Sequence, residues 1–184
     1  MSDPVSALSH ASYDGFASIR EIGPLGMITL RARPDLPALA SAIRDVTGTE
    51  VPALRRIEIN GDRAAGWMAP DEYLLILKYD GVDQALKSLH SALNGQHFLA
   101  VDVSDVRAVF HIGGALAGDV LTKLSPVDVA TLAPGELRRT RAAQVAAAFW
   151  RQDDGFTLVC FRSVAGYVMA LLAQSARPGS TLDG

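Results

Sequence analysis

The sequence predicts an α+β protein of two similar halves, each a mixed or antiparallel sheet with helices packed on one face. Apolar residues change repeatedly between the period of strands and the period of helices. Hairpins are interspersed irregularly among the helices, which disfavours a doubly wound parallel sheet. An internal repeat supports the two halves, because the pattern around Trp67 returns around Trp150, 83 residues later. Each half is expected to run strand, helix, strand, strand, strand, helix.

The first half covers residues 24–95 and opens with an apolar strand over Gly26 to Ala32. A helical pattern follows from about residue 35 to residue 46, with Pro34 just before it. Gly48 supplies a helix stop, since glycine readily adopts the left-handed conformation at a C-terminus. These signals place one strand and one helix ahead of the repeated hairpin.

The repeated hairpin is predicted at Pro70, which presets φ for a turn between two runs of β-favouring residues. Its later copy has Asp153 and Asp154 at the tip. A helix with one apolar face follows each hairpin. The matching faces are Val82, Ala85, Leu86 and Leu89 in the first half, and Ala165, Val168, Met169 and Leu172 in the second.

The second half covers residues 98–176 and opens with a strand over Val106 to Ile112. A helix over Leu116 to Leu124 is entered through two glycines and ends before Pro126, which disfavours helix in the preceding residue. Residues 1–23 form an N-terminal arm and residues 177–184 a tail. Both are rich in Ser, Asp, Gly and Pro and are expected to drape or fray.

Composition excludes several classes of protein. The net charge of -3 lacks the basic surplus that phosphate-backbone binding requires, so nucleic acid is not an expected partner. No apolar window approaches the ~20 residues of a membrane helix. Cys160 is the single cysteine and lies in an apolar run, which favours a buried thiol in a reducing compartment over a reactive nucleophile. We therefore expect a cytoplasmic protein with no membrane association.

Chemical motifs are sparse. His10, His90, His97 and His111 have no ligand spacing with acids or thiols, so no metal site is predicted. The glycines at 113 and 114 suggest a phosphate loop, but they fit neither common phosphate-binding spacing, and Lys123 lies too far into the helix. We therefore expect no catalytic, cofactor-binding or metal-binding residue in this chain.

Asp71 and Glu72 are the strongest candidates for a catalytic acid pair. Successive residues of an extended segment point to opposite faces, so the two carboxylates share a site only if the backbone turns sharply. At a hairpin tip both are expected to face water, where neither is tuned for proton transfer. A turn is therefore favoured over a catalytic pair.

The second half resembles a known domain. "VDVSDVRAVFHIGGALAGDVLTKLSPVDVATLAPGE" is similar to the opening folate-binding domain of the aminomethyltransferases of glycine cleavage. The resemblance covers about half the chain. In those transferases the strand after the threonine carries a catalytic carboxylate, whereas this chain has Ala146, Ala147 and Ala148 in that region.

A second resemblance covers the whole length. Five motifs in order look like the gamma subunit of heterotetrameric sarcosine oxidase: "GMITLRA", "GWMAPDEYLLIL", "VDVSDVR", "SPVDVATLAPGE" and "CFRSVAGYVMALL". Two positions depart from the family, which often has tryptophan where this chain has Tyr73 and arginine where it has Gly118. These departures concern partner contacts.

The gamma-subunit resemblance implies a non-catalytic chain packed against the alpha subunit and, through it, linked to the beta and delta subunits. The complex demethylates sarcosine oxidatively to glycine, passes the one-carbon unit to tetrahydrofolate and forms hydrogen peroxide. FAD, FMN, NAD and tetrahydrofolate are then expected on the other subunits. The alternative is a free-standing folate-binding or one-carbon-transfer protein. Arginines near apolar residues are common in interface cores, so the expected partner contacts are Arg107, Arg138, Arg139, Arg141 and Arg162.

Overall fold

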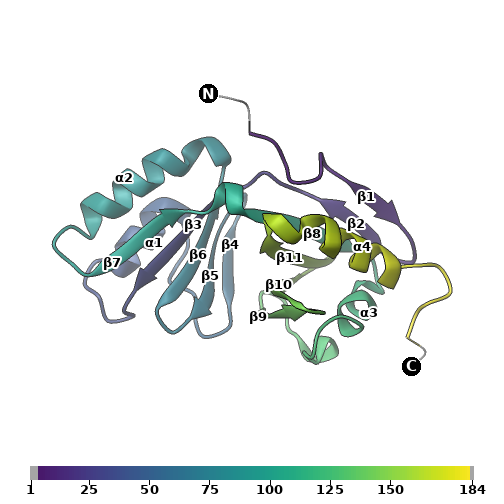
Figure 1. Cartoon of the computed structure of the whole chain (residues 1–184). Coiled ribbons are helices and arrows are strands. Elements are labelled where there is room, and N and C mark those ends of the chain that lie inside the picture. Colours follow the sequence, from purple (N-terminus) through teal and green to yellow (C-terminus); the bar gives the residue numbers. More distant parts are fainter. Residues whose placement is uncertain (1–3, 183–184) are drawn as a thin grey trace. The chain divides into compact units, whose positions relative to one another are not determined.

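The structure is a computed structural model that describes residues 4–182, and the chain forms two compact units (Figure 1). The continuous unit is Leu25–Asp105. The split unit takes the residues up to Pro24 and those from Val106 onward. Within residues 4–182, no helix has both the length and the apolar character needed to cross a membrane.

The continuous unit is a five-stranded antiparallel sheet with two helices on one face (Figure 1). Its strand order is β4-β5-β6-β3-β7. Side chains of both helices pack with one face of the sheet into a core around Leu30, Ile43 and Leu89. The elements are β3 (Gly26–Ala32), α1 (Leu39–Thr47), β4 (Ile57–Asn60), β5 (Arg63–Ala69), β6 (Glu72–Leu77), α2 (Val82–Ala92) and β7 (Phe98–Asp102).

The split unit is a six-stranded antiparallel sheet with the order β1-β2-β8-β11-β10-β9. Its core joins helix residues such as Leu172 to Phe110 and Phe149 of the sheet. The elements are β1 (Ser12–Asp14), β2 (Ser18–Glu21), β8 (Arg107–Gly113), α3 (Ala117–Thr122), β9 (Leu137–Ala142), β10 (Val145–Gln152), β11 (Gly155–Phe161) and α4 (Ala165–Ser175).

The predicted repeat and fold class are confirmed. From β3 to α2 and from β8 to α4 the order is strand, helix, strand, strand, strand, helix. Trp67 lies in β5 and Trp150 in β10, which are matching strands, as the 83-residue spacing predicts. Their pairing differs by one residue, because β5 contains an irregularity between Trp67 and Ala69 that β10 lacks.

Helix α1 starts later than the sequence pattern suggests. It begins at Leu39 rather than near residue 35, and Ala38 has a left-handed φ of 63°. Pro37 explains part of this difference, since a residue that precedes proline is disfavoured in helical conformation. The predicted C-terminus is correct, because Gly48 caps the helix with a φ of 70°.

The compact units differ from the expected boundaries at 24–95 and 98–176. β7 pairs with β3, so residues 98–105 belong to the continuous unit. β2 pairs with β8, so the N-terminal segment belongs to the split unit. Both pairings join distant parts of the chain, and the local sequence pattern does not reveal them.

The N-terminal arm does not drape over the surface as expected. The carboxylate of Glu21, only 4% exposed, accepts hydrogen bonds from Ser6 Oγ and from the backbone N–H groups of Leu8 and His10. Within the same arm, the Phe16 N–H donates to the carbonyl of Ala176 at 2.9 Å. A buried carboxyl group requires such hydrogen-bond partners, and here those bonds order the arm.

Candidate functional site

The β5–β6 hairpin turns at Pro70 and Asp71, with Ala69 opposite Glu72. The prediction of a turn is therefore confirmed. Asp71 is exposed, but the prediction that both acids face water is wrong for Glu72, which is 6% exposed. The reason is that Glu72 begins β6 opposite Arg31 of β3, and the two side chains form an ion pair at 2.9 Å.

The Arg31–Glu72 pair has an electrostatic consequence for the hairpin. The hydrogen bond to Glu72 raises the pKa of the Arg31 guanidinium above its usual value. The Glu72 carboxylate is engaged by the Arg31 guanidinium at 2.9 Å, which suits a structural anchor better than a proton donor. The hairpin tip is thus a braced turn.

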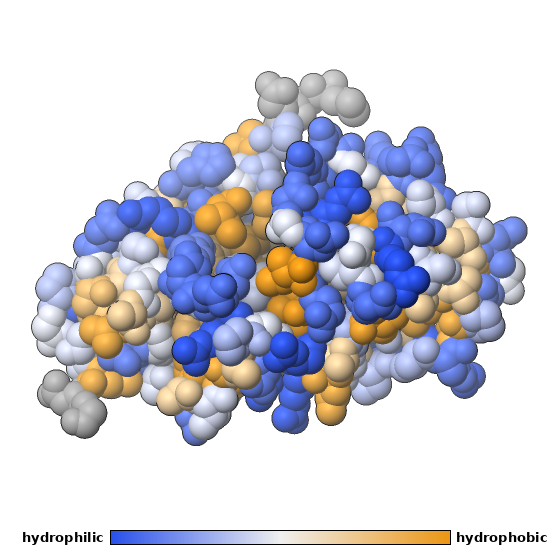
Figure 2. All heavy atoms as spheres, turned by 180° about the vertical axis from the view of Figure 1, so that it is seen from behind, coloured by the Kyte–Doolittle hydropathy of each residue, from blue (hydrophilic) through white to orange (hydrophobic). Residues whose placement is uncertain are grey.

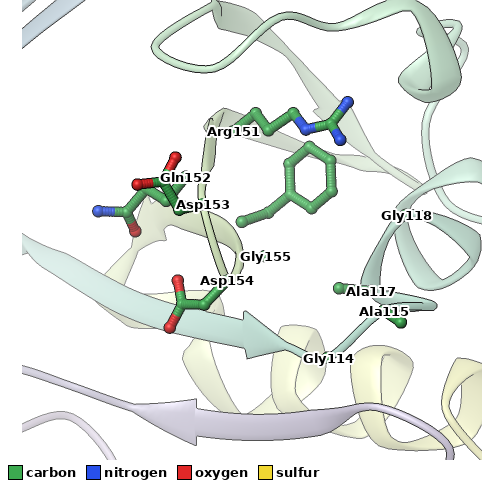
Figure 3. A pocket seen from close by; sticks show the side chains of 10 residues that line it. Gly114, Ala115, Ala117, Gly118, Arg151, Gln152, Asp153, Asp154 and Gly155 are labelled. Atoms are coloured by element: carbon green, nitrogen blue, oxygen red, sulfur yellow. The ribbon is translucent and has the colours of Figure 1, made fainter.

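The β10–β11 hairpin borders a pocket of about 370 Å³ near the start of α3 (Figure 3). In Figure 3 the side chains of Gln152, Asp153 and Asp154 lie on the side of the hairpin away from Gly118. Asp154 contacts His111 Nε2 at 3.3 Å, and Arg151 donates to the carbonyl of Leu132 at 2.7 Å. Arg151 and Asp154 are therefore engaged with protein groups around the pocket.

Lys123 does not serve this pocket, as the sequence predicts. Its ammonium donates to the carbonyl of Ser175 at 2.7 Å and also contacts Ser180, and it lies over the ring of Phe16. Helix α3 has only six residues, so its dipole is small. The glycines at 113 and 114 therefore join a strand to a short helix without a lysine at their loop.

A second pocket, of about 430 Å³, lies in the continuous unit where β3 ends and β7 begins. Its two arginines pair with neighbours: Arg33 with Asp35 at 2.7 Å, and Arg31 with Glu72 at 2.9 Å. Its remaining lining residues are Ala32, Asp71, His97, Phe98 and Leu99. The apolar side is formed by the start of an edge strand.

Three consecutive alanines, Ala146 to Ala148, lie in β10. Ala146 is exposed on β10, while Ala147 and Ala148 are buried in the sheet. Cys160 is fully buried, and that burial raises the pKa of its thiol to about 11. Over residues 4–182, His, Cys, Asp and Glu form no cluster of three suited to a metal ion.

The predicted interface arginines lie in two places of the split unit. Arg107 stacks over Phe161, its cross-strand neighbour, at 4.4 Å, and Arg162 donates to the carbonyl of Ser6 at 3.1 Å. Arg138, Arg139 and Arg141 lie instead on the edge strand β9. Arg138 is bonded to Glu136, while Arg139 and Arg141 are exposed.

Exposed apolar residues lie beside Arg107. Phe161 is 44% and Val106 48% exposed beside Arg107. In the continuous unit, Leu99 and Val101 of β7 are 52% and 41% exposed. Figure 2 shows apolar side chains as separate islands in a largely hydrophilic surface. Sequence reasoning missed all four residues, because an exposed apolar residue in or just before a strand has the same local pattern as a buried one.

Comparison with solved structures defines the class of fold. The chain is similar to heterotetrameric sarcosine oxidase from Corynebacterium sp. U-96 in complex with pyrrole 2-carboxylate, with a TM-score of 0.83, 23% identity and 94% of each chain covered. It is also similar to glycine cleavage system aminomethyltransferase T from Bartonella henselae, with a TM-score of 0.66 and 14% identity over 90% of this chain and 47% of that one. The fold is therefore of the aminomethyltransferase type.

The family follows from the sequence. Residues 31–177 match the sarcosine oxidase, gamma subunit family, and this chain belongs to it. No curated protein sequence matches the chain. The family resemblance derived from the five sequence motifs is thus confirmed.

Proposed function

We propose that this chain is the gamma subunit of a cytoplasmic heterotetrameric sarcosine oxidase, where it packs against the alpha subunit and through it joins beta and delta. The match of residues 31–177 to the gamma-subunit family carries this proposal. The similar fold of the Corynebacterium oxidase chain supports it. The complex would demethylate sarcosine to glycine, transfer the one-carbon unit to tetrahydrofolate and form hydrogen peroxide.

The role proposed for this chain within the complex is non-catalytic. The candidate acid Glu72 serves the fold, since it braces a hairpin through Arg31. The buried Glu21 also has a structural role, since it orders the N-terminal arm. Strand β10 carries alanines at 146–148, the region where the resemblance to the transferases would require an acid. FAD, FMN, NAD and tetrahydrofolate would therefore be bound by the other subunits.

The proposed contacts to alpha include the five arginines, and the two groups are expected to differ in strength. Arg107 combines a guanidinium with the exposed ring of Phe161, a pairing enriched at interface hot spots. Arg162 directly follows Phe161 in the sequence and extends the surface that Arg107 and Phe161 form. Arg139 and Arg141 lie on an edge strand, where charge also protects against sheet-to-sheet aggregation. Arg107 and Phe161 are thus the strongest candidates.

Co-expression with a sarcosine oxidase alpha subunit from the same organism tests the proposal. We expect a stable complex on gel filtration, no flavin absorbance on the chain alone, and sarcosine oxidation only in the assembled complex. Arg107→Ala should weaken the complex about tenfold or more, whereas Arg33→Ala, which removes a paired surface cation, should have little effect.

The alternative, a free-standing folate-binding protein, rests on the similarity to aminomethyltransferase T. Titration of the isolated chain with tetrahydrofolate distinguishes the two. Binding in the micromolar range without alpha, together with failure to join alpha, would replace the gamma-subunit proposal.

A further inference from the structure

Strand β7 is an edge strand whose outer backbone groups face away from the sheet. Val103 N–H donates to the carbonyl of Met27 at 2.9 Å, so the odd-numbered residues of this segment form the ladder with β3. The even-numbered residues Phe98, Ala100 and Asp102 therefore turn their N–H and C=O groups to the outer edge. Within residues 4–182, no backbone hydrogen bond reaches these groups from outside the strand.

The split unit shows what occupies the same place in the other copy of the repeat. There β2 lies beside β8 as β7 lies beside β3, and both pairs are antiparallel. The outer edge of β2 is covered by β1, which pairs with it antiparallel, and Glu21 N–H continues the ladder to the carbonyl of Ala11 at 2.9 Å. The continuous unit has no strand at this position, since β7 ends its sheet.

The side chains of β7 also distinguish it from the other edges. β9 carries three arginines and β1 has only three residues, and both devices discourage pairing with another chain. β4 is a short edge of four residues that includes Glu58. β7 begins with four uncharged residues, Phe98 to Val101, and exposes Leu99 and Val101 on one face. An apolar edge of this kind is normally covered in the working protein.

We propose that β7 accepts an extended segment of the alpha subunit, which pairs antiparallel with it as β1 pairs with β2. This inference rests on the proposed function and names the contact. Backbone hydrogen bonds to Phe98, Ala100 and Asp102 provide the pairing. Apolar side chains at alternate positions of the incoming strand cover Leu99 and Val101, and the pocket of about 430 Å³ at the start of β7 receives one side chain.

Hydrogen–deuterium exchange of the purified complex with alpha tests this pairing directly. In the isolated chain, the amides of Ala100 and Asp102 should exchange rapidly, while those of Leu99 and Val101 are slow because they bond to β3. In the complex the two outer amides should slow by about tenfold or more. A contact through side chains alone would leave them exposed to exchange.

Two variants and a matched control complete the experiment. Leu99→Lys with Val101→Lys should weaken the complex about a hundredfold, and Ala100→Pro should weaken it about tenfold by removing an outward donor. Proline is tolerated there because the lost N–H faces outward from an edge strand. The control Ile59→Lys changes an equally exposed residue, 46% exposed, on the opposite edge of the same sheet, and should change affinity less than about twofold.

The outcomes separate this inference from the proposed function. If the wild-type chain does not bind alpha at all, the gamma-subunit proposal fails. If it binds, but the lysine variant binds equally well and the outer amides exchange unchanged, only the strand pairing fails. If the chain alone forms a dimer that the lysine variant abolishes, a second copy of this chain occupies β7 and the assignment to alpha is overturned.

Discussion

The two sheets share four strands in the same order but obtain the fifth from opposite directions along the chain. In the continuous unit β7 follows α2, whereas in the split unit β2 precedes the whole repeat. β2 is then covered by β1 and linked to the buried Glu21, while β7 is left at the edge. The repeat therefore specifies a four-stranded sheet and its helices, and leaves the fifth strand to non-local pairing.

The largest difference between the two units is expected at the two matching tryptophans. Trp150 is 4% exposed, whereas Trp67 is half-buried beside an irregularity in its strand. Trp150→Ala should reduce the free energy of unfolding by about 4 kcal/mol, and Trp67→Ala by roughly half as much. Urea denaturation followed by circular dichroism measures both.

Trp150→Phe is the control for that experiment. It keeps most of the buried ring and removes an indole N–H that is buried without a hydrogen-bond partner in residues 4–182. The loss should be under about 1.5 kcal/mol. Equal losses for the two alanine variants would show that the units bury these residues alike.

Glu21 tests why the split unit can recruit its N-terminal strand. Glu21→Gln replaces one acceptor oxygen by a donor that faces donors, so the free energy of unfolding should fall by about 3 kcal/mol. Exchange of the amides of Leu8 and His10 should accelerate as the arm is released. Glu50→Gln, at an exposed carboxylate bonded to Arg44, is the control and should change little. An arm that stays protected in Glu21→Gln would mean that the strand pairing alone holds it.

Cys160 gives the split unit a buried thiol whose ionisation affects stability, whereas the matching residue of the continuous unit is Leu77. Burial raises the pKa of this thiol from 9.0 to about 11. The folded state holds the thiol proton more tightly than the unfolded state does. The contribution of Cys160 to the free energy of unfolding is therefore fully present below pH 9 and is lost as the pH rises from about 9 to about 11. The loss should approach about 2 to 3 kcal/mol.

Denaturation curves of wild type and Cys160→Ala between pH 8 and pH 11 isolate this effect, because all other titrating groups are shared. The free energy of unfolding of wild type should approach that of Cys160→Ala as the pH rises. A constant difference would indicate that the thiol titrates alike in both states.

The smallest effect of a substitution is expected at the tip of the β5–β6 hairpin, which carries Asp71 and Glu72. Asp71→Asn with Glu72→Gln should leave turnover of the assembled oxidase unchanged within about twofold, since removing a general acid or base costs about 10²-fold or more. Thermal stability should fall slightly as the pair with Arg31 is lost. A large loss of turnover in a folded, assembled variant would make this hairpin part of the chemistry.

Local pattern was enough to predict the repeated hairpins and helices. Pro70, Gly48 and the apolar faces of α2 and α4 act through neighbours in sequence, and their elements lie where the spacing requires. Strands β1, β2 and β7 were not predicted as members of their sheets. Their partners lie far along the chain, and a buried acid such as Glu21 is indistinguishable from an exposed one until its donors are known.

The features of the candidate site also divide into those that follow from local sequence and those that depend on non-local pairing. The turn role of Asp71 and the burial of Cys160 follow from local context, and both were predicted. The ion pair of Glu72 with Arg31 depends on the register of β3 against β6, which the sequence does not specify. The exposure of Leu99 depends on which strand ends the sheet.

The approach of residue 15 to the end of α4 has a consequence for chain connectivity. Phe16 N–H bonds to the carbonyl of Ala176, and a Cβ on Gly15 would lie 1.8 Å from that oxygen. A circular permutant opened after Pro24 and joined from Ala176 to Gly15 would carry its last strand after its last helix, as the continuous unit does. The natural order would thereby become a plain tandem duplication, at the loss of the residues before Gly15, which include β1.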